Sequence, residues 1–321
     1  MLEQDYPAGY EVVVVDMNSK DDTMLFLKSM VSQYPHLIVT QTPASARNVS
    51  PIRLALTLGI RGASYDWTIL TDASCMPSSP HWLTHMAEAC SKDENTQIVL
   101  GITRFVEGKG WHGLRCRFFR AWQEMLNFSY AKRHGAYRAD GTNLAYRRSL
   151  FLEHRGFADH SKLLVGATEI MVNRHSTRQN TALCLHPDAI MLQDTPQYRG
   201  WWSQERLFFM ETRRHFRHVF LFRLRYLWSI ILTWVPTLLT IATVAAGLYL
   251  KNHIAVAIAV VLWTAYNSCL IYRFNKKAKE FGEQPFTFSY TLLSHLIPWW
   301  DVTAWLHWLF TKRRTFQKKF I

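Results

Sequence analysis

Short apolar runs of strand length alternate with longer apolar stripes of helical spacing along the N-terminal part of the chain. The short runs occupy residues 11–15, 37–40, 67–70 and 97–101. The stripes occupy residues 23–34, 52–62, 81–90, 111–130 and 166–173. Runs rich in Val, Ile and Leu are typical of strands in a sheet that is covered on both faces. Their alternation with helices predicts a doubly wound α/β domain.

The run Trp67–Leu70 organises the candidate chemistry. Glycines precede it and prolines follow it, which predicts a buried strand of a parallel sheet. Asp72 comes directly after this strand, as Asp16 ends the strand at 11–15. Ligands of open α/β sheets bind beyond the carboxyl ends of the strands, and a carboxylate there suits a divalent cation. Capping of the next helix is the alternative role for Asp72.

The chain changes character after Pro196. Residues 201–225 are basic, aromatic and amphipathic, as in a helix that lies among lipid head groups. Residues 226–250 and 254–274 are each long and apolar enough to span a bilayer, so they predict a transmembrane hairpin. A third apolar stretch, 286–310, has basic residues at both ends, and we expect an interfacial or re-entrant helix there rather than a third span.

The formal charge of +13 gathers around these apolar segments. Arginines precede the first span and lysines follow the second, which favours membrane lipids over nucleic acid as the partner. The positive-inside rule then places the N-terminal domain in the cytoplasm. The five cysteines form no CxxC pair, which argues against a disulfide framework or a zinc site. Residues 1–10 lack the basic and apolar regions of a signal peptide.

These changes in composition predict four segments. An α/β domain occupies residues 1–196, and an amphipathic interfacial segment follows at 197–225. Two transmembrane helices occupy residues 226–274, and a basic C-terminal segment with the interfacial or re-entrant helix occupies 275–321.

Five ordered motifs carry a resemblance to a known family. They read LEQDYP at 2–7, EVVVVDMNSKDDT at 11–23, LTLGIRGASYDWTILTDASCMP at 56–77, GTNLAYRRSLF at 141–151 and WWSQERLFF at 201–209. Together they resemble the family 2 glycosyltransferases of GT-A fold, of the kind attached to the bacterial inner membrane. The resemblance implies an inverting transfer from a nucleotide sugar to a lipid-linked or growing glycan acceptor. It also implies a divalent cation, Mg²⁺ or Mn²⁺, at a DxD-type motif.

The resemblance assigns roles on the donor side. Asp16 matches an acid of the region that contacts the nucleotide base. Asp72 matches the first acid of DxD and would be the metal ligand, whereas Ser74 stands in place of the second acid. A hydroxyl is a poorer ligand for Mg²⁺ or Mn²⁺ than a carboxylate, so metal affinity should be lower here. Arg206 corresponds to an arginine that offsets the diphosphate charge, with contact to a lipid head group as the alternative.

On the acceptor side, the resemblance assigns the pocket to Gly141, Thr142 and Asn143. Glu169 is the remaining acid of the cluster that holds the family's catalytic base. A carboxylate at this place can deprotonate a sugar hydroxyl that lies within hydrogen-bond distance. The alternative is that Glu169 only interacts favourably with the dipole of its helix. Asp301 is a candidate for contact with a lipid head group or the acceptor.

The resemblance also exposes a difference. Members of the family open with an apolar strand in the middle of the sheet, and this chain begins after the place of that strand. We therefore expect unpaired neighbours in the sheet, and an upstream start codon. The altered motifs leave a second hypothesis open, a catalytically degenerate transferase that binds a nucleotide or a partner as a scaffold. A channel is disfavoured because the two spans carry no intramembrane charge.

Overall fold

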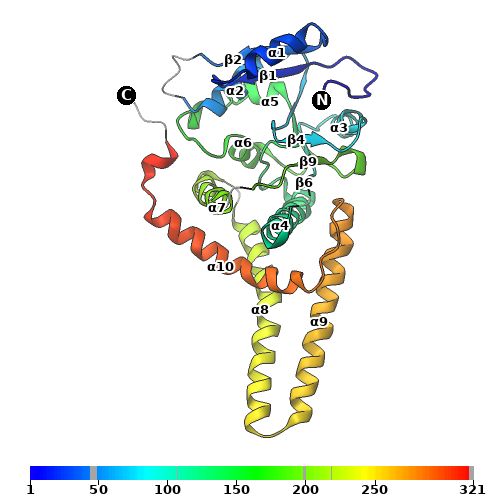
Figure 1. Ribbon diagram of the computed structural model, residues 1–321, viewed down its shortest axis with the longest axis vertical. Coiled ribbons are helices and arrows are strands. Elements are labelled where there is room, and N and C mark those ends of the chain that lie inside the picture. Colours follow the sequence, from blue (N-terminus) through cyan, green and yellow to red (C-terminus); the bar gives the residue numbers. More distant parts are fainter. Residues whose placement is uncertain (44–48, 107, 198–199, 218, 318–321) are drawn as a thin grey trace.

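The computed structural model describes residues 1–321 except 44–48, 107, 198–199, 218 and 318–321. A mixed α/β domain sits above a long two-helix hairpin, and a further helix runs across the foot of the domain (Figure 1). Parts of the segments predicted at 197–225 and 275–321 lie outside the described residues.

The described strands form three sheets. A parallel pair joins β1 (Val12–Asp16) and β2 (Leu37–Gln41). A four-stranded sheet has the order β3 (Trp67–Leu70), β7 (Leu144–Arg147), β5 (Ile98–Gly101) and β8 (Thr181–Cys184). A third sheet has the order β4 (Cys75–Pro77), β9 (Met191–Gln193) and β6 (Thr103–Phe105). The short strands β4, β6, β8 and β9 were not predicted, because strands of three or four residues carry little periodicity.

Helices cover these sheets and continue beyond them. In the α/β domain they are α1 (Thr23–Val31), α2 (Pro51–Gly62), α3 (Trp82–Cys90), α4 (Gly110–His134), α5 (Arg148–Glu153) and α6 (Ala167–His175). The later ones are α7 (Trp201–Thr212), α8 (Phe220–Tyr249), α9 (His253–Glu280) and α10 (Ser289–Phe310). Helix α2 begins with Pro51, and proline suits the first turn because backbone N–H groups there have no partner within the helix. Gly135 directly follows the last residue of α4 and has a φ of +88°.

The environment predicted for Trp67–Leu70 is wrong. This strand, β3, pairs antiparallel with β7, and three of its four residues are only half-buried. The valines of β1 are also half-buried. Among the described residues, β1 pairs only with β2, and β3 pairs only with β7. Each of the two strands thus has one edge without a ladder partner among the described residues.

The hydrophobic core fixes the hairpin to the domain. Ala278 and Phe281, at and just after the end of α9, belong to the same buried cluster as Leu100 of β5. The ring of Phe281 packs edge-to-face on Phe128 of α4, with centroids 5.2 Å apart. Because these contacts are buried, the hairpin is an extension of the domain core rather than a loosely tethered anchor.

An ion pair reinforces this connection. Nε of Arg117, on α4, donates to the Glu283 carboxylate at 3.1 Å, and the Glu283 side chain is 1% exposed. A buried carboxylate of this kind depends strongly on its partner, because an unpaired charge is costly away from water.

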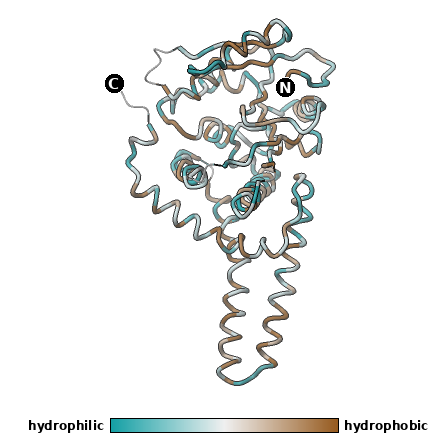
Figure 2. Tube along the Cα trace, viewed as in Figure 1, coloured by the Kyte–Doolittle hydropathy of each residue, from teal (hydrophilic) through white to brown (hydrophobic). Residues whose placement is uncertain are grey.

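Helices α8 and α9 are both long and apolar enough to cross a membrane, and most of their side chains are not buried inside the protein. Their apolar surface is visible along the hairpin (Figure 2). This fits the predicted transmembrane hairpin. The single amphipathic helix expected over 201–225 is not present: α7 ends at Thr212, a 3-10 turn covers Arg213–His215, and α8 begins at Phe220.

Candidate functional site

The turn after β3 shapes the surroundings of Asp72. Its Oδ1 accepts hydrogen bonds from the backbone N–H of Ser74 at 2.8 Å and from the Ser74 hydroxyl at 2.7 Å. Oδ2 carries no hydrogen bond to the described residues. Mg²⁺ and Mn²⁺ bind proteins through one or two carboxylates and complete their shell with water and substrate phosphates. One exposed carboxylate with a free oxygen can therefore supply one ligand to such a cation.

Asp16 is engaged inside the protein. Its carboxylate is buried at the end of β1 and accepts hydrogen bonds from the hydroxyl and N–H of Ser19 and from Nε2 of Gln41. The Ser19 hydroxyl is the main reason that the pKa of Asp16 lies below its ordinary value. Asp16 thus closes the turn after β1. Its carboxylate and that of Asp72 follow strands of different sheets, and no described hydrogen bond joins them.

The segment Gly141–Asn143 lies at the centre of the domain. The amide of Asn143 donates to the carbonyl oxygens of Ile102 at 2.8 Å and Ala189 at 2.9 Å, and accepts from Nε1 of Trp82. A Cβ on Gly101 would lie 2.4 Å from this amide, so only glycine fits there. The Asn143 side chain is therefore a structural link from the segment between β5 and β6 to the 3-10 turn at Pro187–Ala189 and to α3. Asn143, Gly141 and Thr142 line a cavity of about 430 Å³.

Glu169 stands in the first turn of α6. The helix is preceded by Gly166 in the left-handed conformation, where a Cβ would meet the Thr212 side chain at 2.3 Å. Nη2 of Arg138 forms an ion pair with the Glu169 carboxylate at 2.9 Å, and the Glu169 side chain is 14% exposed. Burial raises the pKa of Glu169 to about 7, because it outweighs the opposite effect of Arg138. A pKa near neutrality suits a general base.

Four further charged residues, absent from the predicted site, line the cavity beside Gly141–Asn143. They are Arg120, Glu124, Arg138 and Asp140. Arg120 pairs with Asp140 and, at 3.2 Å, with Glu124. Burial raises the pKa of Glu124 to about 7. Burial also acts to raise the pKa of Asp140, but Arg120 and Arg138 outweigh it and hold that pKa far below the ordinary value.

The sequence contained a signal for part of this group. Arg120 and Glu124 are four residues apart on one helix face, and Asp140 directly precedes the predicted pocket segment. Oδ1 of Asp140 accepts from the Thr142 hydroxyl at 2.7 Å. The structure thus brings Thr142 and Glu169 to the charged residues Arg120, Glu124, Arg138 and Asp140. No described hydrogen bond or ion pair joins these residues to Asp72 or Asp16.

Arg206 lies apart from the donor turn, residues 72–74 after β3. It is buried on α7, where it pairs with Asp301 of α10, and its guanidinium stacks over Phe119 and Trp202. Burial lowers the pKa of Arg206, and Asp301 acts in the opposite direction. Both Arg206 and Asp301 line a second cavity, of about 740 Å³, between α4, α7, α8 and α10. Arg138 lines both cavities and so connects Glu169 to the second one.

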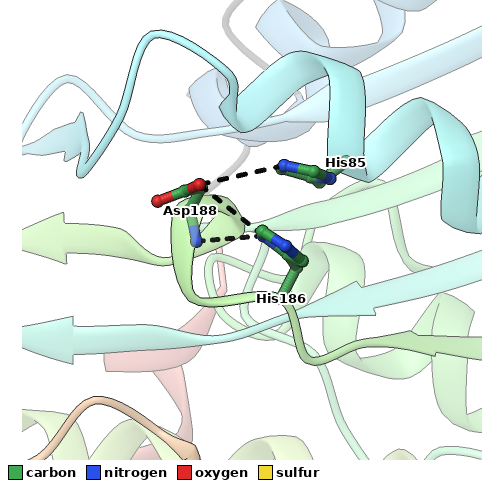
Figure 3. Close-up of side chains that lie close together, drawn as sticks. All are labelled: His85, His186 and Asp188. Carbon is green, nitrogen blue, oxygen red and sulfur yellow. Dashed lines mark hydrogen bonds and ion pairs between the residues drawn. The ribbon is translucent and has the colours of Figure 1, made fainter.

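One other group of potential metal ligands lies on the surface. His85 of α3, His186 and Asp188 place their ligand atoms within 4.8 Å of one another (Figure 3). The two rings stack with centroids 3.5 Å and planes 22° apart, and the Asp188 N–H donates to His186 Nδ1. Nearly parallel rings do not direct their in-plane lone pairs at one ion. Asp188 and Asp72 also flank opposite ends of the β4–β9 ladder, so this group is separate from the donor turn.

Comparison with known proteins gives a family and distant structural neighbours. Residues 1–155 match the sequence model for glycosyl transferase family 2. No curated protein matches the chain. Solved structures that resemble it include S. aureus TarS, with 18% identity, a TM-score of 0.43 and coverage of 65% of this chain and 35% of that one. TarS 1–349 in complex with UDP has 16% identity, a TM-score of 0.42 and coverage of 65% and 58%.

A mycobacterial protein has 12% identity, a TM-score of 0.36 and coverage of 62% of each chain. The chain spans 35% to 58% of the length of the TarS chains that it matches. The family match covers the donor turn, the Gly141–Asn143 segment and all the strands between β1 and β7. Over residues 1–155, just under half of its length, the chain is therefore similar to glycosyl transferase family 2.

Proposed function

We propose that the chain transfers a sugar from a nucleotide-sugar donor to a lipid-linked or glycan acceptor at the cytoplasmic face of the inner membrane. The observation that carries the proposal is Glu169, a carboxylate with a pKa of about 7 that is paired with Arg138, and Arg138 lines both cavities. Glu169 in its ionised form accepts the proton of the acceptor hydroxyl as that oxygen attacks the sugar. Arg138 holds the carboxylate in place.

On the donor side, we assign Asp72 as the ligand of Mg²⁺ or Mn²⁺, with Ser74 holding the carboxylate orientation through Oδ1. A divalent cation bound there supplies positive charge against the donor diphosphate. Ser74 leaves one carboxylate where the family usually has two, so we expect weak metal binding and a requirement for millimolar cation, on the order of 1 mM or more.

Orientation follows from the arginines and lysines near both domain-side ends of the hairpin. Arg223 and Arg225 lie in the first turns of α8, whereas Lys276, Lys277 and Lys279 lie in the last turns of α9. Cationic side chains stay on the cytoplasmic side of a membrane span. We therefore place the α/β domain in the cytoplasm and α7 and α10 along the inner face.

The test uses the full chain in detergent micelles, a panel of nucleotide sugars and a bacterial membrane-lipid extract as acceptor. Release of nucleoside diphosphate and labelling of the lipid fraction are measured. We expect Asp72→Asn to abolish the cation-dependent signal. Asp93→Asn is the matched control, because Asp93 closes the same kind of turn on Asn95 at 2.8 Å but lies in the loop between α3 and β5. Equal rates for Asp72→Asn and the wild type would contradict the donor assignment.

A second candidate function is nucleotide or partner binding without transfer. Two observations favour it: Ser74 replaces an acid, and the carboxylate of Asp16 is fully engaged in internal hydrogen bonds. It predicts that the wild type binds a nucleotide sugar but turns over none of the panel, and that Ser74→Asp restores turnover. Turnover by the wild type excludes it.

A further inference from the structure

The second cavity, of about 740 Å³, has a composition that the transfer chemistry does not require. It opens between α4, α7, α8 and α10, at the foot of the α/β domain where the hairpin begins (Figure 1). Its walls are largely aromatic: Phe119, Trp122, Tyr137, Phe209, Phe222 and Tyr226. Aromatic walls with a few charged groups are typical of sites that bind a partly apolar small molecule.

The cavity also carries excess positive charge. Four arginines and two carboxylates line it, which gives a formal charge of +2. Arg206 is paired with Asp301, and Arg138 is paired with Glu169 and lies 3.9 Å from Glu205. The other two cations differ in this respect. Arg213 and Arg223 form no ion pair with any residue that the structure describes.

Two buried polar atoms of the cavity lining lack a hydrogen-bond partner. They are Nε of Arg206, whose side chain is 4% exposed, and the hydroxyl of Tyr226. A buried donor without a partner costs free energy, so such atoms in a folded protein call for an explanation. Nε of Arg206 can only donate a hydrogen bond, and the Tyr226 hydroxyl can donate one. An acceptor group would therefore satisfy both atoms, and the arginines of the lining without an ion pair favour an anionic one.

The position of the cavity defines the rest of the ligand. Arg223 lies in the first turn of α8, whose N-terminal dipole also favours an anion. From there α8 continues as an apolar helix, on which Leu224, Leu227 and Trp228 are exposed. An amphiphile can place its anionic group between the arginines and lay its apolar chain along this surface. Inorganic phosphate alone would leave the aromatic walls uncovered.

We propose that this cavity binds the phosphate head group of a membrane lipid between Arg213 and Arg223, and that this lipid carries the acceptor. The second part rests on the proposed function, because it is Glu169 that would act on the acceptor. Arg138 lines the same cavity and pairs with Glu169 at 2.9 Å, so the cavity that would hold the head group includes the partner of the proposed base.

The experiment measures binding without transfer. The full chain is purified in dodecyl maltoside, and retention of dodecyl phosphate is followed by native mass spectrometry, with dodecanol and inorganic phosphate as the neutral and chain-free probes. We expect the wild type to retain dodecyl phosphate. Arg213→Gln and Arg223→Gln should each weaken binding about tenfold, the usual effect of one charge-assisted contact. Arg223→Lys should keep most of the affinity.

Arg225→Gln is the matched control. Arg225 lies on the same helix but outside the cavity lining, where it donates to the Ser129 hydroxyl at 2.6 Å, so its replacement should leave dodecyl phosphate binding unchanged. The proposal is overturned if Arg213→Gln and Arg223→Gln bind as tightly as the wild type while remaining folded. It is also overturned if inorganic phosphate displaces dodecyl phosphate at equal concentration. Normal lipid binding with no turnover of any nucleotide sugar would refute the proposed function alone.

Discussion

Replacing Glu169 by Gln tests the proposed base through two opposite effects. Gln keeps the shape of the side chain and an acceptor oxygen for Arg138, but it cannot take up a proton at neutral pH. We expect the transfer rate to fall by about 10²- to 10⁴-fold, the usual contribution of a positioned base. In the wild type the rate should rise with pH around a midpoint of about 7, because only the ionised form of Glu169 is active.

The magnitude of the stability effect follows from the same pKa. A rise from 4.5 to about 7 means that ionising Glu169 costs the folded state about 3 kcal/mol. Because the pKa is raised on folding, the neutral carboxyl of Glu169 is the form that stabilises the folded state. This contribution to the free energy of unfolding is fully present below pH 4.5 and is lost as the pH rises through about 7. The Gln variant lacks this loss, so it should be more stable than the wild type at pH 8 and similar at pH 5.

The assay combines nucleoside diphosphate release with thermal unfolding of the detergent-solubilised chain at pH 5 and pH 8. Glu153→Gln, an exposed position on α5, is the control and should change neither measurement. The reasoning is refuted if Glu169→Gln keeps the wild-type rate and midpoint. In that case Glu124, which has a pKa of about 7 in the neighbouring cavity, is the residue to replace next.

Two further predictions concern the framework of the site, both read by thermal unfolding. Arg53→Met removes two buried donors to main-chain carbonyls in the loop before α6, so it should lower the free energy of unfolding by about 2–4 kcal/mol, whereas Arg61→Met on the exposed face of α2 should change it little. Arg117→Met leaves Glu283 buried without its partner, with an expected loss of about 3–5 kcal/mol. Arg133→Met, exposed on the same helix, is its control, and equal losses in either pair would contradict the assignment.

Local patterns predicted many of the elements that carry the candidate site. The strand at 67–70 and the helices at 52–62, 81–90 and 111–130 lie within two to four residues of the observed β3, α2, α3 and α4. Strong periodicity and Gly or Pro at the boundaries depend only on short stretches of sequence, so they predict these elements without knowledge of the tertiary structure. Glu169 was predicted as the catalytic base from the resemblance to the family, and the structure shows its pairing with Arg138.

Pairing and burial were decided by the tertiary structure. The antiparallel partner of β3 comes from residues 144–147, far along the chain, and no local pattern specifies which strand a given strand will meet. The same is true of the pKa values near 7, which arise because α4, α6 and the loop before Gly141 enclose several charges together.

The sequence by itself determined the α/β class, the apolar hairpin and the order of the family's motifs, since each depends on residues that are close together in the chain. Only the tertiary structure decided that Arg206 pairs with Asp301 and that Arg213 and Arg223 line an aromatic cavity without an ion pair to any described residue. Those relations join α7, α8 and α10, whose separation in sequence carries no information about distance in space.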